Sequence, residues 1–484
     1  MLASRPVTPV LPERAPFALR ARVISPLAGG GTQHEPDGIV AVGADGRLSY
    51  VGPASAYVGP ASAGSAFAGS APGASADFPP AVDVRPWVAL PGLVDLHAHL
   101  PQITNAGLGF GTPLLDWLRR YVFPLEHDFD EAAAERLAPL AFRSFAAAGT
   151  TSVLLYGAVW QPSLDAAFRA AEAHGIRATI GKVMMDRITY DEDPRSQAET
   201  MDLSLRQSAE LCARWHMRDA GRLRYAFTPR FAVSCSADLL RESAALALEA
   251  DALWQTHISE DAAEIAEVAR LFPEARDYLD AYDRAGALGP RAVLAHAIHL
   301  SAREVGRLAE SGSRIAHCPA SNLFLASGTM PLARYLEAGI VVGLGSDVAG
   351  GPDLSIFGAM RVGAYVQNAL RVAGADGADE RPILDPLAWL RLGTLEGARA
   401  LGTDDVTGSL EAGKEADLIL VDPSLTDPLH VADGGAGGAD AALTELPGRD
   451  LSDPADLVSR LIFRAHPAMV RATYVRGRRL EGPS

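Results

Sequence analysis

The feature that most constrains the fold is a regular alternation of strand-like and helix-like runs between residues 87 and 402. The apolar, strand-like runs are WVALPGLVDLH, TTSVLLYG, RATIGKVMMD, LRYAFTPRF, ALWQTHIS, AVLAHAIHL, RIAHCPAS and IVVGLGSDV. Helical periodicity occupies residues 130–148, 162–174, 199–219, 237–250, 261–270, 302–312, 353–372 and 386–401. Buried strands that alternate with helices indicate an α/β fold with a parallel sheet, and eight of them can close a (β/α)8 TIM barrel.

The two ends of the chain have a different sequence pattern, with short strand-like runs. Residues 18–52 predict short strands with a hairpin around Ala44-Asp45-Gly46, and strand-like runs return after Gly402. We expect residues 1–86 and 403–484 to combine into a small composite β-sandwich domain beside a catalytic barrel of residues 87–402. Within the small domain, the Ala, Ser, Gly and Pro of 53–80 predict a flexible insertion, and 423–450 predicts a loop.

Composition excludes several classes of function. The formal net charge of −16 repels a phosphate backbone, so a nucleic-acid partner is not expected. No apolar run is long enough to cross a membrane, and the N-terminus lacks the apolar segment of a signal peptide. The three cysteines are odd in number and far apart, which does not suit a disulfide framework. These features predict a cytoplasmic protein that acts on a small molecule.

Metal-ligating residue types gather at the carboxyl ends of the predicted strands, where barrel active sites assemble. His97 and His99 end the first strand, and residues two apart in a strand share a face. His257 ends the fifth strand, His296 lies in the sixth and Asp347 ends the eighth. One such pair alone is weak evidence, but four matching strand ends indicate a metal site. Nitrogen and oxygen ligands of this kind suit Zn²⁺, and Fe²⁺ stays an open alternative.

The same residues lie in longer motifs that resemble a known family. The chain resembles the amidohydrolase superfamily in PGLVDLHAH, THISE, AH and GSDVAGG. Within that superfamily it resembles the guanine deaminases in LPQ, TPLLDWLRRYVFPLEH, GKVMMD, TPRFAVSCS, AHCPASNLFLASG and GLGSDVAGG. The resemblance runs from about residue 88 to residue 400 and includes the later segment GSLEAGKEADLILVD.

The resemblance implies hydrolysis of guanine to xanthine and ammonia, one Zn²⁺ per subunit and a homodimer. The implied metal ligands are His97, His99, His257, His296 and Asp347, although His296 could instead lie in the second sphere. The implied catalytic residues are Glu260, Asp347 and His296. The implied substrate contacts are Gln102, Arg230, Phe231, His257, Glu260 and Asp347.

The residues suggest how these roles divide. Asp347 is expected to accept a proton from the attacking water and Glu260 to pass protons to the purine, which requires a raised pKa for Glu260. Arg230 could donate to O6 or N7 of guanine, because a guanidinium is a rigid fork of donors. The fourth strand carries Arg230 and no lysine that could bridge two metal ions, and Lys182 lies on the third strand, so one ion is expected.

Other readings stay open. A different aminohydrolase with the same ligands, acting on 8-oxoguanine, cytosine or a triazine, is the nearest alternative. A non-catalytic scaffold is a second one, although every proposed ligand and Glu260 are present. Aromatic residues such as Trp117, Phe123 and Phe324 are expected in the core, and His317 is expected to pack at the seventh strand beside Cys318.

Overall fold

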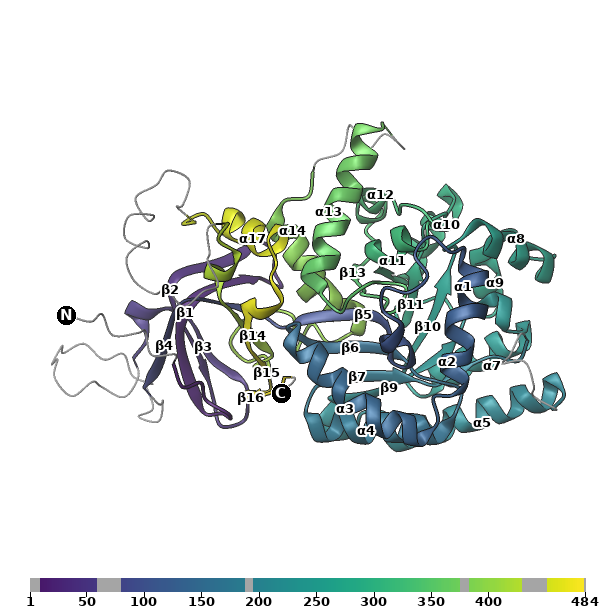
Figure 1. Cartoon of the computed structure of the whole chain (residues 1–484), viewed down its shortest axis with the longest axis horizontal. Helices are drawn as coiled ribbons and strands as arrows, with labels where there is room; N and C mark the ends of the chain where they lie inside the picture. The colour runs from purple at the N-terminus through teal and green to yellow at the C-terminus, as the bar shows by residue number, and fades with distance from the viewer. Residues whose placement is uncertain (1–8, 59–79, 188–194, 375–382, 429–450, 483–484) are drawn as a thin grey trace.

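A computed structural model describes residues 9–58, 80–187, 195–374, 383–428 and 451–482. Its strands form two sheets that lie at opposite ends of the molecule (Figure 1). The sheet at the right of Figure 1 comes from the middle of the chain and is covered by helices. The sheet at the left combines strands from the two ends of the chain.

Eight parallel strands form a nearly closed barrel, as the sequence predicts. They are β5 (Leu93–His99), β6 (Thr150–Tyr156), β7 (Arg177–Gly181), β9 (Leu223–Pro229), β10 (Leu253–Ile258), β11 (Ala292–His296), β12 (Arg314–His317) and β13 (Val342–Leu344). Each strand pairs in parallel with the next one in this order, and the two-residue strand β8 (Val183–Met184) also pairs with β9. All eight strands of the predicted barrel are therefore confirmed.

The barrel closes between its last and first strands through the loop that follows β13. The Asp347 amide donates to the His97 carbonyl at 2.7 Å, and the His99 amide donates to the Val348 carbonyl at 3.1 Å. These bonds hold the end of the eighth strand beside the end of the first. Side chains from both strands therefore meet at one rim.

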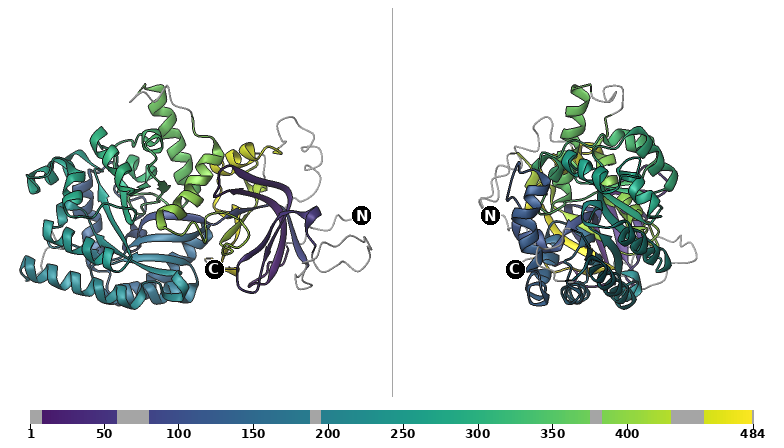
Figure 2. Two further views of the ribbon diagram at one scale, coloured as in Figure 1. Left: turned by 180° about the vertical axis from the view of Figure 1, so that it is seen from behind. Right: turned by 90° about the vertical axis from the view of Figure 1, so that its right-hand side faces the viewer.

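Helices cover the outside of the barrel (Figure 2). Several begin at a reciprocal cap: Ser196, Asp261 and Ser301 each accept from the third amide of their helix, whose glutamate side chain accepts in return. The longer helices are α3 (Glu131–Ala147), α4 (Gln161–His174), α5 (Gln197–Trp215), α7 (Ala237–Glu249), α8 (Ala262–Leu271), α10 (Ala302–Ser311), α13 (Ile356–Val372) and α17 (Pro454–Phe463). The shorter ones are η2 (Leu100–Asn105), α1 (Leu114–Trp117), η3 (Leu118–Val122), α2 (Phe123–His127), α6 (Arg218–Gly221), η4 (Ala232–Ser234), α9 (Tyr278–Arg284), α11 (Pro319–Phe324), α12 (Leu332–Glu337), α14 (Pro386–Arg391), η6 (Leu392–Glu396) and α15 (Gly397–Leu401).

The small sheet has seven strands in the order β16-β15-β14-β4-β1-β2-β3. They are β1 (Phe17–Pro26), β2 (Thr32–Val42), β3 (Leu48–Pro53), β4 (Ala81–Pro91), β14 (Leu418–Val421), β15 (Val470–Val475) and β16 (Arg478–Arg479). Two strands separate β1 from β15, yet the rings of Phe17 and Tyr474 lie 5.2 Å apart. The sheet is therefore rolled, and its two halves face each other across one apolar core. The predicted sandwich is thus one continuous sheet folded over itself.

Some segments differ from the prediction. The run WVALPGLVDLH is not one strand, because Gly92 divides it into the end of β4 and the start of β5. A Cβ at Gly92 would lie 2.1 Å from Thr151 Oγ1, so only glycine fits this crossing between the two sheets. Helix α17 comes from the C-terminal segment but packs against α14 beside the barrel. The predicted domain boundaries, which divide the chain into residues 1–86, 87–402 and 403–484, stay a prediction.

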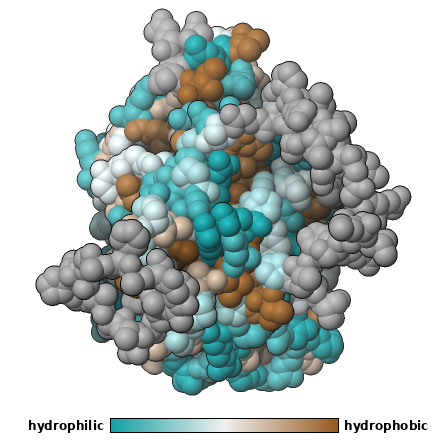
Figure 3. Space-filling view, turned by 90° about the vertical axis from the view of Figure 1, so that its left-hand side faces the viewer, coloured by the Kyte–Doolittle hydropathy of each residue, from teal (hydrophilic) through white to brown (hydrophobic). Residues whose placement is uncertain are grey.

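Two predicted irregular stretches are only partly described. Of the predicted insertion at 53–80, residues 59–79 lie outside the described residues, and of the predicted loop at 423–450, residues 429–450 do. The described part of the latter begins with a short turn, η7 (Pro423–Thr426), and a second turn, η8 (Pro467–Met469), precedes β15. Seen from the small-sheet end, the surface is largely hydrophilic with scattered apolar side chains (Figure 3). Among the described helices, none combines the length and the apolar character needed to cross a membrane.

Candidate active site

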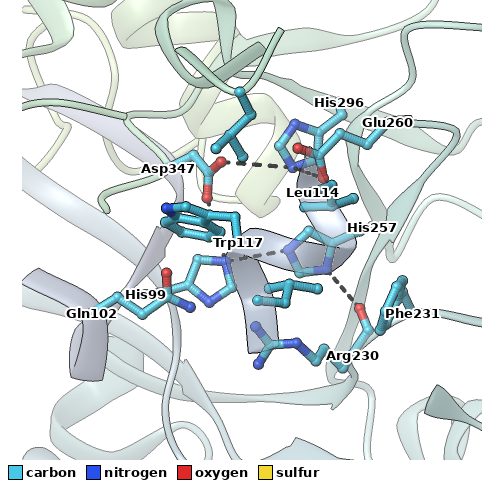
Figure 4. A pocket seen from close by; sticks show the side chains of 12 residues that line it. His99, Gln102, Leu114, Trp117, Arg230, Phe231, His257, Glu260, His296 and Asp347 are labelled. Carbon is cyan, nitrogen blue, oxygen red and sulfur yellow. Dashed lines mark hydrogen bonds and ion pairs between the residues drawn. The ribbon is translucent and has the colours of Figure 1, made fainter. Parts of the chain in front are cut away.

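The five predicted metal ligands converge at the carboxyl ends of the barrel strands (Figure 4 shows three of the histidines and the aspartate). Asp347 Oδ1 lies 3.2 Å from His97 Nε2 and 3.4 Å from His99 Nε2. His257 Nε2 lies 3.2 Å from His99 Nε2, and His296 Nε2 lies 3.8 Å from Asp347 Oδ2. All five side chains are buried.

The hydrogen bonds behind two of these histidines fix which nitrogen faces the cluster. His257 Nδ1 lies 2.6 Å from the Arg230 carbonyl oxygen, which can only accept, so Nδ1 carries the proton. Nε2 of His257 then presents a lone pair to the cluster. His296 Nδ1 lies 2.9 Å from Asn322 Oδ1, which sets the same tautomer. Metal-binding histidines usually donate their second nitrogen to an acceptor in this way.

The arrangement fits a divalent cation. His97 Nε2 and His296 Nε2 are buried and make no hydrogen bond among the described residues. Burial lowers the pKa of His99 to about 4 and that of His257 well below its usual value, so both imidazoles are neutral at pH 7. Burial alone would raise the pKa of Asp347, but the neighbouring histidines hold it well below its usual range. Neutral imidazoles around a carboxylate form a donor set that suits zinc.

The backbone at this rim is held in uncommon conformations. His296 has φ 73° and Asp347 has φ 46°, both in the left-handed region that non-glycine residues rarely adopt. Such conformations cost about 1–3 kcal/mol each and cluster at functional sites. Gly345 allows the close approach of β13, because a Cβ there would lie 2.8 Å from His97 Cβ. The GSDVAGG motif therefore shapes the rim as well as supplying a ligand.

Glu260 lies at the same rim, where the sequence predicts a proton carrier. Its Oε2 is 3.4 Å from His296 Nε2, and Ser327 Oγ lies 3.4 Å from its Oε1. Burial, together with the negative charge of Asp347, raises the pKa of Glu260 well above its usual value. The direction of this shift agrees with the expectation from the sequence.

A pocket opens beside the cluster, and all three predicted recognition residues line it, namely Gln102, Arg230 and Phe231. The remaining lining residues are His99, Leu114, Trp117, Leu118, His257, Glu260, His296, Leu325 and Asp347. Trp117 is buried in the core, as expected, but its ring also lines the pocket (Figure 4). Helix α1, which carries it, thus contributes both Leu114 and Trp117 to the pocket lining.

Glu126, which the sequence alone did not single out, contacts two of the recognition residues. Its carboxylate accepts from Gln102 Nε2 at 2.7 Å and from Arg230 NH1 at 2.5 Å. Arg230 therefore both forms a buried ion pair with Glu126 and lines the pocket. Only the motif FPLEH, in which Glu126 follows a proline-containing helix start, offered a signal in the sequence.

The comparison with protein families decides the assignment. The model of the Amidohydrolase family matches residues 88–480. The chain belongs to the amidohydrolase family. A Deinococcus radiodurans protein named "Probable guanine deaminase" is 38% identical over 389 residues, which are 80% of this chain and 83% of that protein.

Solved structures support the same placement. The guanine deaminase of C. acetobutylicum, described with bound guanine in its active site, has a TM-score of 0.79 and 25% identity, and the match covers 96% of this chain and 99% of that one. An adenosine deaminase of Xanthomonas campestris with bound zinc has a TM-score of 0.75 and 27% identity, covering 97% and 93%. Amidohydrolases are metal-dependent enzymes, and the described cluster of this amidohydrolase has the matching donors.

Two further polar residues lie outside the pocket of this amidohydrolase. Lys182 follows β7 and is buried against α5, where its Nζ donates to Ser204 Oγ at 3.1 Å. It therefore does not reach the metal cluster, and no described lysine lines the pocket. His317 ends β12 and is buried, as the sequence predicts, and burial lowers its pKa to about 3.

Proposed function

We propose that this amidohydrolase hydrolyses guanine to xanthine and ammonia with one Zn²⁺ per subunit. The observation that carries the proposal is the convergence of three features in one pocket. These are the histidine–aspartate cluster, the buried Glu260 and the pair of Gln102 and Arg230. The first supplies hydrolytic chemistry, the second can move protons and the third can read a polar heterocycle.

The ion would be held by His97, His99, His257 and Asp347, and His296 would either join them or hold the oxygen that forms on the substrate. Bound Zn²⁺ lowers the pKa of a water to about 7 and so supplies a nucleophile at neutral pH. Fe²⁺ is compatible with the same donors. Among the described residues no lysine lines the pocket, which supports a single ion.

Two carboxyl groups with separated pKa values divide the proton transfers. Asp347 is ionised at neutral pH and can accept a proton from the attacking water. Glu260, whose pKa is raised, can protonate a ring nitrogen beside C2, then take the proton of the new C2 hydroxyl and pass it to the leaving amine, and it regains its own proton from Asp347. The water thus contributes its oxygen to C2 and its protons to the ring and to ammonia.

Recognition of a neutral purine needs a flat apolar slot with few polar groups. Leu114, Trp117 and Phe231 supply apolar walls, and Arg230 can donate to O6 or N7 of guanine. Adenine offers an amine at C6 instead of the O6 acceptor and has no amine at C2. We therefore expect adenine to be neither recognised by Arg230 nor deaminated at C2.

The proposal is tested by ammonia release from guanine, 8-oxoguanine, cytosine and adenine by the metal-loaded protein. The expected result is that guanine has the highest kcat/KM and gives xanthine and ammonia in equal amounts. Higher kcat/KM on 8-oxoguanine or cytosine would move the substrate assignment to that base. A fully metal-loaded protein that releases no ammonia from any of them would indicate the non-catalytic scaffold.

We also propose that the enzyme is a cytoplasmic homodimer. The three cysteines are buried and form no disulfide, which supports a reducing compartment. Light scattering is expected to give twice the 50.9 kDa mass of one chain. A mass of 50.9 kDa at micromolar concentration would contradict the dimer.

A further inference from the structure

Glu126 lies at the junction of the residues that line the recognition side of the pocket. It is fully buried on α2, whereas Gln102 follows β5 and Arg230 follows β9. One carboxylate oxygen accepts from Gln102 Nε2 at 2.7 Å, and the other accepts from Arg230 NH1 at 2.5 Å. A single side chain therefore joins two recognition residues that are far apart in the sequence.

The contact with Glu126 determines how the amide of Gln102 is turned. An ionised carboxylate only accepts hydrogen bonds, so the amide nitrogen of Gln102 must face Glu126. The amide oxygen then points away from Glu126. Gln102 lines the pocket, so its oxygen is the atom that can accept from a bound heterocycle. The hydrogen bond to Glu126 therefore favours this orientation of the Gln102 amide over the one with its oxygen and nitrogen exchanged.

The guanidinium of Arg230 is held by the same helix. The Nη1 atom of Arg230 donates to Glu126, and its Cζ lies 5.4 Å from the centre of the Phe123 ring. Phe123 lies one turn before Glu126 on α2. A charge-assisted hydrogen bond and a cation–π contact together restrict both the position and the plane of the fork. Arg230 therefore presents its donors to the pocket in a fixed direction.

This helix also forms the apolar wall of the pocket. Segments α1, η3 and α2 run continuously from residue 114 to residue 127, and η3 is a π-helical turn, a rare feature that often occurs at functional sites. Leu114, Trp117 and Leu118 of this stretch line the pocket. The apolar wall and the anchor for the polar contacts are thus parts of one structural unit.

We infer that Glu126 is a positioning residue that presents Gln102 as an acceptor and Arg230 as a fixed donor to the purine. The inference rests on the proposed function, because it assigns these two residues to the purine. Glu126 acts through them and does not line the pocket itself. Its Oε1 also lies 4.0 Å from His99 Nδ1, so the test must separate recognition of the purine from support of the metal site.

The test compares Glu126→Gln with wild type and with Glu304→Gln. Glu304 is a matched control, because it is a buried carboxylate that accepts from Ser301 N and Leu279 N and does not line the pocket. The measurements are metal content, kcat and KM for guanine, and the inhibition constant of hypoxanthine. Hypoxanthine keeps O6 but has no amine at C2, so it reports binding alone.

We expect Glu126→Gln to keep its metal and to lose about 10²-fold in kcat/KM, the scale of loss caused by misplacing a positioned group. The loss should come mainly from KM, with a parallel rise in the hypoxanthine constant. Gln102→Ala should cost much less in the Glu126→Gln background than in wild type, because both changes remove the same contact. Glu304→Gln should retain wild-type constants.

Three results would overturn the inference. They are wild-type constants in Glu126→Gln, losses that multiply fully when it is combined with Gln102→Ala, and a loss of metal that accounts for the fall in activity. If Glu126→Gln does not fold, Glu126→Asp replaces it: the charge stays, but the shorter side chain cannot reach both partners. Wild-type turnover is measured first, since a wild type inactive on guanine refutes the proposed function, whereas an active wild type with an unaffected variant refutes only this inference.

Discussion

At the scale of single residues, the site depends on imidazole lone pairs that face one another. Nε2 of His257 and Nε2 of His99 are 3.2 Å apart, and the His257 tautomer is fixed from behind by the Arg230 carbonyl. His257 Nε2 therefore presents a lone pair, and a cation bound between the two rings would use this nitrogen together with Nε2 of His99. His257 is thus the histidine of this pair whose role as a ligand is best defined.

His257→Ala should consequently lower metal content and abolish activity in a folded protein. Loss of a supporting group alone costs about 10–100-fold in metal affinity, and loss of a ligand should cost at least as much. His299→Ala is the matched control, since His299 is exposed and its imidazole hydrogen-bonds the Ser327 carbonyl rather than any residue of the metal cluster. Metal analysis after dialysis against a mild chelator tests whether His257 is a ligand. Equal metal occupancy in the two variants would show that it is not.

The sequence predicted the residues whose spacing reflects local geometry and missed those whose role depends on long-range packing. His97 and His99 share a face because a strand alternates, which the sequence displays directly. Glu126 meets Gln102 and Arg230 across 24 and 104 positions, and no local pattern encodes those contacts. The sequence places Trp117 in the core but cannot show that it also lines the pocket, because the pattern of apolar residues in a helix is the same in both cases.

At the scale of elements, β13 must approach β5 closely enough to bring Asp347 to His97. Gly345 makes this possible, because a Cβ there would meet His97 Cβ at 2.8 Å and Cys318 Sγ at 2.9 Å. Periodicity was sufficient to predict all eight barrel strands. It could not find the break at Gly92, because the run is apolar on both sides of it and the two halves enter different sheets.

Gly345→Ala should therefore displace β5 from β13 and lower the metal content. It should also reduce kcat by about 10²-fold. Gly306→Ala is the control, since Gly306 lies exposed in α10 with nothing within 4 Å of an added Cβ. That change should leave activity intact and raise stability by about 0.5–1 kcal/mol. If kcat and metal content of Gly345→Ala match those of Gly306→Ala, the close packing of the two strands is not what positions the ligands.

At the scale of the whole molecule, a buried ionic network joins the small sheet to the starts of barrel strands. Arg177, the first residue of β7, donates to Glu415 at 2.5 Å and to Asp417 at 3.0 Å, just before β14. Arg476, beyond β15, also donates to Glu415 at 2.7 Å and reaches the backbone of Asp219 at 2.9 Å. The network lies at the opposite end of the strands from the active site.

This network should make stability depend on pH. Burial alone would raise the pKa of Glu415, but Arg177 and Arg476 hold it below its usual value. A carboxyl group with a lowered pKa stabilises the fold above its unfolded pKa, about 4.3, and the contribution disappears as the pH falls through the folded value. Glu415→Gln should thus cost about 2 kcal/mol at pH 7 and progressively less below pH 4.

Thermal unfolding of wild type, Glu415→Gln and Glu310→Gln between pH 3 and pH 8 measures this dependence. Glu310 is the control because its carboxylate is largely exposed and lies 3.8 Å from Arg307, so its removal should change little. A difference in Tm between wild type and Glu415→Gln that stays constant over the whole range would show that the loss is not a loss of charge.

The most direct test of the account as a whole is guanine turnover by Glu260→Gln at full metal occupancy. Glu260 faces His296 at 3.4 Å in the pocket, and glutamine keeps its shape but cannot carry a proton. General acid–base groups contribute about 10²–10⁴-fold, so we predict that kcat falls by at least about 10²-fold. Metal content and hypoxanthine binding should be retained. A Glu260→Gln enzyme that converts guanine to xanthine and ammonia at the wild-type rate would contradict the account.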